Sequence, residues 1–325
     1  MLNKSSSKVL LIILIVLAGL FFILRYTDRT EQTIREHLVS VDTARIDNIL
    51  IRLPRHGGSV ELKKDGSNWK VKEGSRNYNA DNRKVRQVIG QISELVPKSI
   101  AARSHKQWGK YQVTDSLGTR LQMKEGDKVE ADVVLGRISF RAPKKQNQNP
   151  YMQQQQTEIL MYARPYDDNS VYVVDGMVKL GMGNNPDDFR QKLFCRIKPG
   201  DIKSLTFSYQ GEPTFTLQGE NNKWVLDGQP VDSAATAKYI HNFSYAQGAK
   251  FVNGFNPSGQ VPSGKISIEL NGQQPVVLTA YKVDSTHTVV HSTLNEESYF
   301  NGQSGKIFEK FFVKKDHFSP GNKTK

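Results

Sequence analysis

An unbroken apolar run stands at the start of this chain, and segments that alternate between apolar and polar residues make up most of the remainder. The run extends from Val9 to Leu24 and is flanked by Lys8 and Arg25. A helix of this length spans about 24 Å, and Tyr26 with the snorkelling cations extends it towards a hydrocarbon layer of about 30 Å. The pattern therefore predicts a single transmembrane helix at residues 9–24.

Charges on the two sides of the run predict its orientation. Residues 1–8 carry Lys4 and Lys8 without an acid, whereas residues 25–42 mix cations with acids. The positive-inside rule then places the N-terminus in the cytoplasm and exports the body of the chain. A cleaved signal peptide is the alternative interpretation, although no A-x-A pattern follows Leu24.

Beyond the linker, the chain reads as two copies of one unit. Residues 43–53 and 200–209 both show the period-2 pattern of a half-buried strand. A second short strand and a Gly- or Asn-rich turn follow in each copy, and a tryptophan, Trp69 or Trp224, then opens a third strand. The same order of patterns in both copies indicates an internal duplication.

Each copy continues with a helical stripe after an acidic cap. Asp81 precedes apolar positions from Val85 to Leu95, and Asp232 precedes a stripe that ends at Phe243. We therefore predict the α+β class, with two tandem repeats of a β-hairpin/helix/β-strand unit after the transmembrane helix. The predicted segments are the N-terminus (1–8), the span (9–24), a linker (25–42), the first repeat (43–183, with a low-complexity loop at 141–156), a connecting helix (184–198), the second repeat (199–313) and a flexible tail (314–325).

The net charge of +13 is concentrated in the membrane-proximal half. Residues 25–150 carry 25 Lys and Arg against 15 Asp and Glu. In an exported protein this favours an acidic protein, an anionic lipid or an anionic polymer as partner, while a solvated basic face without a ligand is the alternative. No nucleic-acid-binding motif is present. The cations predicted to contact the anionic partner are Lys63, Lys64, Arg83, Lys84 and Arg86.

With the tryptophan hairpins and capped helices, the segment from Asp187 to Phe194 and the stretch Ile197-Lys-Pro-Gly-Asp-Ile202, the chain resembles the bacterial DUF4340 family. The resemblance covers nearly everything from residue 43 to about residue 312. It implies a bacterial envelope protein, anchored in the cytoplasmic membrane with its body in the periplasm. It also implies an auxiliary role beside ABC transport systems linked to gliding motility.

Residues with reactive or metal-binding side chains do not form a recognisable set. His287 and His291 lie in a β-branched run that predicts a strand. On a strand, side chains four residues apart lie too far from each other to bind one metal ion. Gly181-Met-Gly183 reads as a turn before a helix cap, and the single Cys195 excludes an internal disulfide and reads as a small buried hydrophobe. We therefore predict no catalytic, cofactor or metal site.

Together these features predict a non-enzymatic accessory or scaffold protein of the cell envelope, in a transport or motility complex. The alternative is an envelope glycan-binding module or hydrolase that acts in the groove between the two repeats, because ligand sites are common where domains meet.

Overall fold

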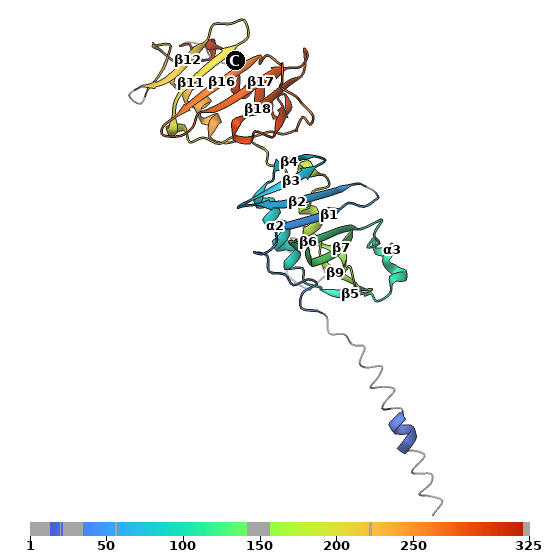
Figure 1. Ribbon diagram of the computed structural model, residues 1–325. Helices are drawn as coiled ribbons and strands as arrows, with labels where there is room; N and C mark the ends of the chain where they lie inside the picture. The colour runs from blue at the N-terminus through green and yellow to red at the C-terminus, as the bar shows by residue number, and fades with distance from the viewer. Residues whose placement is uncertain are drawn as a thin grey trace, which may run out of the picture. The chain divides into compact units, whose positions relative to one another are not determined.

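The structure is a computed structural model that describes residues 14–19, 21, 35–55, 57–141, 157–220 and 223–320 of the 325. Within these ranges, the chain forms 19 strands in three sheets, together with short helices (Figure 1). The predicted transmembrane segment, residues 9–24, is described only at residues 14–19, which are helical, and at residue 21. No helix in the described ranges combines the length and the hydropathy needed to cross a bilayer.

The first sheet has nine strands in the order β4-β3-β2-β1-β6-β7-β8-β9-β5. Its members are β1 (Asn48–Arg52), β2 (Ser59–Asp65), β3 (Asn68–Glu73), β4 (Arg76–Asn79), β5 (Ser99–Ala102), β6 (Thr119–Glu125), β7 (Lys128–Arg141), β8 (Glu158–Pro165) and β9 (Val171–Asp175). The hairpin β2–β3 closes between Asp65 and Asn68, where Gly66 adopts φ +58. A positive φ of this kind is readily adopted by glycine, which explains the turn that the sequence predicts.

The second large sheet has eight strands in the order β14-β13-β12-β11-β16-β17-β18-β19. They are β11 (Ile202–Tyr209), β12 (Phe215–Glu220), β13 (Lys223–Leu226), β14 (Gln229–Pro230), β16 (Gly264–Leu270), β17 (Val276–Lys282), β18 (Thr288–Ser292) and β19 (Tyr299–Asn301). Both large sheets thus grow outward from a strand, β1 or β11, that has a chain of hairpins on each side. A third, two-stranded sheet pairs β10 (Leu193–Cys195) with β15 (Ala246–Gln247).

The helices are short. The α-helices after the N-terminal segment are α2 (Asn82–Ser93), α3 (Trp108–Tyr111), α4 (Met177–Gly181), α5 (Ser233–His241) and α6 (Ile307–Phe311). The 3-10 turns are η1 (His105–Gln107), η3 (Pro186–Asp188), η4 (Pro199–Asp201), η5 (Asn242–Ser244), η6 (Thr293–Asn295), η7 (Ser304–Lys306) and η8 (Lys315–Phe318). The predicted caps of α2 and α5 are confirmed, because Asp81 and Asp232 each accept hydrogen bonds from two backbone amides of the first turn.

The predicted α+β class is wrong, because the described chain is mostly antiparallel β-sheet. The capped helical stripes are conspicuous in the sequence, yet they yield only the 12 residues of α2 and the 9 of α5. Most of the chain instead alternates with period 2 between tight turns, which joins each strand to its neighbour as a hairpin. The residue boundaries of the two predicted repeats stay a prediction.

The predicted connecting helix at residues 184–198 is a single 3-10 turn, η3. The side chain of Asn185 accepts a hydrogen bond from the Asp188 amide, and Asp188 Oδ2 accepts one from the Asn185 amide. This capping box starts a helix, but the chain leaves it at once. Arg190 forms an isolated bridge with Ala80, and β10 begins at Leu193. Tertiary contacts thus end a helix that its N-terminal signals favour.

The chain divides into two compact units by its internal contacts. The first contains Ile51–Gly57, Val88–Met182 and the described residues up to Ile46; the second contains Asp47–Leu50, Gly58–Gln87 and the chain from Gly183 onward. Strands β2, β3 and β4 and the first turn of α2 therefore belong to the second unit. The low-complexity loop predicted at residues 141–156 lies outside the described residues, apart from Arg141.

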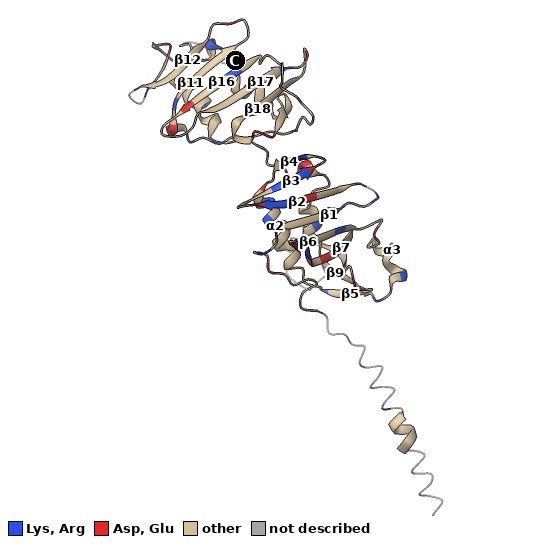
Figure 2. Ribbon diagram, in the orientation of Figure 1, with Lys and Arg blue, Asp and Glu red and all other residues tan. Residues whose placement is uncertain are grey.

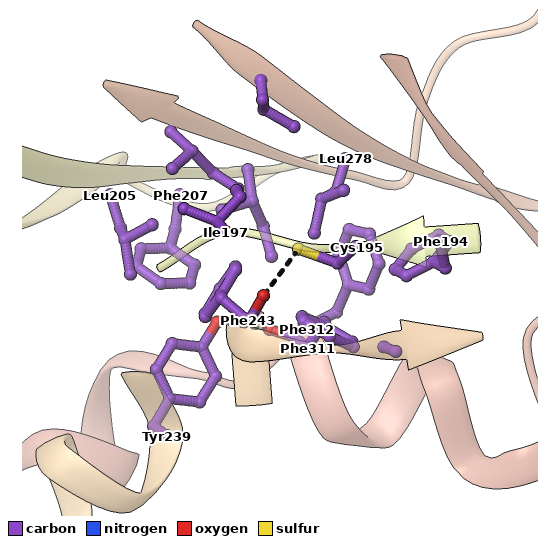
Figure 3. Close-up of a cluster of buried hydrophobic side chains, with 14 of the residues drawn as sticks. Phe194, Cys195, Ile197, Leu205, Phe207, Tyr239, Phe243, Leu278, Phe311 and Phe312 are labelled. Atoms are coloured by element: carbon purple, nitrogen blue, oxygen red, sulfur yellow. Dashed lines mark hydrogen bonds between the residues drawn. The ribbon is translucent and has the colours of Figure 1, made fainter. Parts of the chain in front are cut away.

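An aromatic core fills the second unit (Figure 3). The rings of Phe207 and Phe215 stack with centroids 4.6 Å apart, and Phe311 meets Phe243 edge to face at 5.0 Å. Phe318 is fully buried, 5.1 Å from the ring of Tyr239. The predicted flexible tail is therefore wrong as far as residue 318, since burying a phenylalanine contributes about 1.5–3 kcal/mol.

Candidate functional site

The first turn of α2 places two of the predicted contact residues. Asp81 Oδ1 accepts hydrogen bonds from the backbone amides of Arg83 and Lys84 at 3.0 and 3.3 Å. The cap fixes the start of the helix, which leaves Arg83 exposed and Lys84 half-buried. The Lys84 Nζ lies 5.0 Å from the centroid of the Phe189 ring.

A second group of cations comes from the segment around β10. Lys192 precedes this strand and is half-buried, while Arg196 follows it and is exposed. The Arg196 guanidinium lies 5.1 Å from the centroid of the Tyr245 ring. Pairing between β10 and β15 holds this segment beside Ala246 and Gln247.

Arg83, Lys192 and Arg196 line one groove of about 190 Å³, which we call the basic groove. Its complete lining is Asp81, Asn82, Arg83, Gln191, Lys192, Leu193, Arg196, Tyr245 and Gln247. Asp81 is the one carboxylate among these residues, and its side chain is engaged in capping α2. The groove thus carries an excess of positive charge, which attracts anions within about a Debye length of 8–10 Å.

Lys84 lies close enough to the basic groove to feel its charge. Burial lowers the pKa of the Lys84 ammonium; Asp188 opposes this shift, and the neighbouring cation Lys192 lowers the pKa further. Asp81 also raises the pKa of Lys84, so burial is the main cause of the lowered pKa.

The structure brings together only part of the predicted contact set. Arg83 lines the basic groove and Lys84 lies near it, whereas Arg86 is exposed further along α2. Lys63 and Lys64 are consecutive residues of β2, so their side chains point to opposite faces of the sheet. Figure 2 shows these cations spread over β2 and α2.

Lys192 and Arg196, which complete the basic groove, are absent from the predicted set. They lie more than a hundred residues from Arg83 in the sequence. The sequence also predicts a helix for the segment that carries Lys192. Only the observed 3-10 turn and the β10–β15 pairing show where Lys192 and Arg196 lie.

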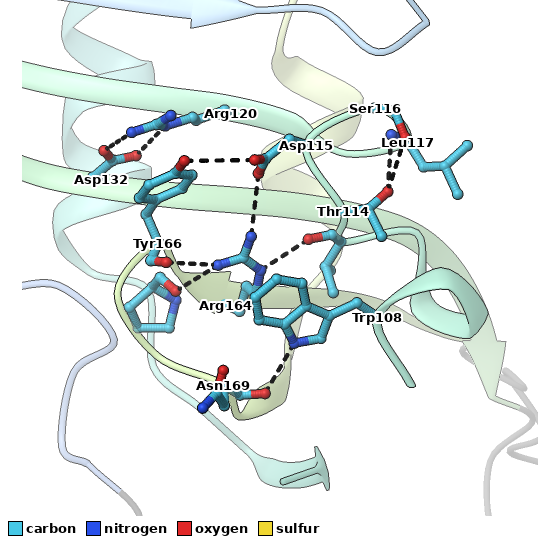
Figure 4. Close-up of polar contacts among 12 residues, drawn as sticks. Trp108, Thr114, Asp115, Ser116, Leu117, Arg120, Asp132, Arg164, Tyr166 and Asn169 are labelled. Atoms are coloured by element: carbon cyan, nitrogen blue, oxygen red, sulfur yellow. Dashed lines mark hydrogen bonds and ion pairs between the residues drawn. The ribbon is translucent and has the colours of Figure 1, made fainter. Parts of the chain in front are cut away.

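Arg164 is the buried centre of a polar network in the first unit (Figure 4). Its Nε donates to the Val113 carbonyl at 2.9 Å, and its Nη1 donates to the Tyr166 carbonyl at 2.7 Å. The guanidinium lies 3.6 Å from the centroid of the Trp108 ring, and Nη2 is 3.3 Å from Asp115. Burial lowers the pKa of Arg164 and Asp115 opposes the shift. These contacts join three segments of the fold, which gives Arg164 a structural role.

Arg120 and Asp132 form a two-pronged ion pair in the same network. Arg120 forms two hydrogen bonds with the Asp132 carboxylate, at 2.8 and 2.6 Å, and lies 3.2 Å from the centroid of the Tyr166 ring. The hydrogen bonds to Asp132 raise the pKa of Arg120. Because both oxygens of Asp132 are engaged, this pair stabilises the β6–β7 hairpin and leaves little capacity for a ligand.

Arg190 is the buried arginine of the second unit. Its guanidinium lies 3.5 Å from the centroid of the Tyr78 ring and 3.8 Å from that of Phe251. Its side chain also donates to Asp187 at 2.9 Å, to Asn253 at 2.6 Å and to Ser298 at 3.2 Å. The planar Arg190 guanidinium thus stacks on two rings and donates to three side chains at once. These contacts join segments that are distant in sequence.

The remaining residues singled out in the sequence also have structural surroundings. Burial raises the pKa of the Cys195 thiol to about 12, and its Sγ lies 3.4 Å from the Phe243 carbonyl oxygen. Trp69 is buried, and Trp224 packs against the aromatic core.

The two histidines differ in their partners: His287 contacts Asp284, whereas His291 stacks on Tyr299. Gly181 ends α4, and Gly183 lies in the turn before Asn185, which caps η3. Across the described ranges, no group of three or more His, Cys, Asp or Glu side chains is arranged to hold a metal ion.

Comparison with known proteins identifies the family. No curated protein and no solved structure matches the chain. A protein-family model described as "Domain of unknown function (DUF4340)" matches residues 69–264, which is more than half of the sequence. This range includes the α2 cap, the buried arginines and every residue that lines the basic groove. The chain therefore belongs to the DUF4340 family.

Proposed function

We propose that this chain is a non-enzymatic accessory protein of the bacterial cell envelope, in a transport or motility complex, and that its basic groove binds an acidic segment of a protein partner. The observation that carries the proposal is the convergence of Arg83, Lys192 and Arg196 on one groove. Three cations from two separate segments concentrate positive potential there, which steers an acidic partner and fixes its register.

The size of the groove supports a protein partner over a free small molecule. Its volume of about 190 Å³ is below the range of about 300–1,000 Å³ that is typical of small-molecule sites. A groove of this size accommodates the carboxylate of an acidic side chain, and Arg83 and Arg196 are exposed at its edge. Guanidinium groups bind carboxylates through two parallel hydrogen bonds, which adds orientation to the charge attraction.

Location at the membrane is part of the same proposal. The apolar segment Val9–Leu24 supports attachment of the N-terminus to the cytoplasmic membrane, with the C-terminal body in the periplasm. Among its described residues, Leu14, Ile15 and Phe21 are each more than half exposed. Large apolar side chains that are exposed on a helix favour contact with an apolar environment.

The test is crosslinking in native membranes followed by affinity purification of the full-length chain. A variant with Arg83→Glu, Lys192→Glu and Arg196→Glu reverses the charge of the groove. The matched control, Lys203→Glu, Lys265→Glu and Lys282→Glu, makes the same charge change at exposed positions on β11, β16 and β17. Specific transport or motility proteins that are recovered with wild type and control, and lost with the groove variant, would support the proposal.

Two further results bear on the electrostatic mechanism. Recovery of the partner should fall as salt is raised, because exposed charges are screened beyond about 8–10 Å. If the groove variant recovers the same partners as wild type at all salt concentrations, the basic groove is not the contact. If wild type recovers no other protein, the accessory role is wrong.

A further inference from the structure

A second pocket in the second unit differs from the basic groove in size and chemistry. Its volume is about 510 Å³, which falls within the range of small-molecule sites. We call it the aromatic pocket, and its lining consists of Arg76, Asn77, Tyr78, Phe255, Asn256, Pro257, Glu296, Glu297 and Tyr299. Three aromatic rings, two carboxylates, two amides and one guanidinium thus surround a single cavity.

The aromatic rings of this pocket are held in place by their neighbours. Phe255 lies 5.1 Å from Tyr299 and 5.2 Å from Tyr281, measured between ring centroids. Tyr299 stacks at 4.6 Å on His291, and Tyr78 packs against the Arg190 guanidinium. Phe255 and Tyr299 are nevertheless only half-buried. Packing already holds these rings in place, so a ligand does not have to order them when it binds. They form an apolar platform that is open on one side.

Polar groups surround this platform with a mixture of fixed and free side chains. Glu297 is fixed, because its two oxygens accept hydrogen bonds from Lys70 at 3.0 Å and Asn79 at 2.6 Å. Glu296, Asn77 and Arg76, which also line the pocket, are exposed. Planar carboxylate, amide and guanidinium groups each present two hydrogen-bonding atoms side by side.

We propose that the aromatic pocket binds an uncharged pyranose unit of a glycan. A pyranose ring has an apolar face of C–H groups, which packs on an aromatic platform, and a rim of adjacent hydroxyls, which matches paired donors and acceptors. Because Glu297 is already paired with Lys70, the remaining charges, Arg76 and Glu296, cancel. This balance favours a neutral sugar over an anionic one. The inference is independent of the acidic partner proposed for the basic groove.

The experiment uses the detergent-purified full-length chain and three soluble probes. Saturation-transfer NMR and calorimetry are carried out with triacetylchitotriose, cellotriose and the anionic trigalacturonate. We expect one or both uncharged trisaccharides to bind in the millimolar range. Absence of saturation transfer to both, or stronger binding of trigalacturonate, would overturn the assignment.

Variants place the binding in the pocket. Phe255→Ala removes one ring of the platform and should weaken binding by about tenfold or more. Phe140→Ala is the matched control, since Phe140 is 68% exposed at the end of β7 in the first unit. Glu296→Ala changes an exposed side chain that the fold does not need, and it should weaken binding several-fold without lowering Tm.

If Phe255→Ala and Glu296→Ala both bind the sugar as wild type does, the pocket is not the site. The variant with a charge-reversed basic groove should retain sugar binding in full. Its loss there would contradict the independence of the two sites.

Discussion

Replacement of Arg190 by lysine tests how the second unit is held together. Lysine keeps the positive charge, but it removes the planar group that lies between the rings of Tyr78 and Phe251. An ammonium group is a compact point charge that cannot stack on two rings and bond in a fork at the same time. We therefore expect Arg190→Lys to destabilise the second unit although the net charge is unchanged.

The magnitude follows from the contacts that are lost. A hydrogen bond involving a charged group contributes about 1.5–3 kcal/mol, and a desolvated cation–π contact contributes about 2 kcal/mol. Lysine retains part of the hydrogen bonding to Asp187 and Asn253. The Asp187 side chain is also 38% exposed, so water can satisfy it. The expected net loss is about 3 kcal/mol, which combines the lost hydrogen bond to Ser298 with the loss of stacking on the two rings.

The assay is urea unfolding of the full-length chain in detergent, monitored by far-UV circular dichroism. A loss of this size lowers the unfolding midpoint by about 1 M or more. Arg196→Lys is the matched control in the same unit, because Arg196 is exposed and should change stability by no more than about 0.5 kcal/mol. If Arg190→Lys is as stable as this control, the stacked guanidinium does not hold the unit together.

Two further predictions concern the core of the second unit. A Cβ added at Gly248 would overlap the buried ring of Phe300. Gly248→Ala should therefore lower the free energy of unfolding by about 1–3 kcal/mol in the same urea assay. Gly200→Ala, where a Cβ meets open space, is the control and should not lower it, so equal stability of the two variants would refute the argument. Burial raises the pKa of Cys195 to about 12, so at pH 8 about one thiol in ten thousand is ionised. Iodoacetamide should therefore alkylate Cys195 only in urea, which the intact mass of the chain would show. Rapid alkylation of the folded chain would contradict this burial.

Local signals in the sequence determined the pieces whose physics is local. Asp81 and Asp232 cap helices because a carboxylate satisfies the free amides of the first turn, and Gly66 marks a hairpin because glycine adopts positive φ at low cost. The period-2 segments likewise identified strands, since burial on one face requires alternation. These effects involve residues only a few positions apart, so they can be read without a structure.

Tertiary structure alone decided how these pieces combine. Antiparallel pairing of many short strands makes the chain mostly β, and the capping box at Asn185 yields one 3-10 turn because Arg190 is drawn into contacts with Tyr78, Phe251 and Asn253. Both proposed sites depend on the same kind of distant contact. The basic groove joins Arg83 to Arg196, and the aromatic pocket joins Tyr78 to Phe255 and Tyr299. The sequence shows which residues are charged and which are aromatic, but packing between remote segments determines which of these residues come together.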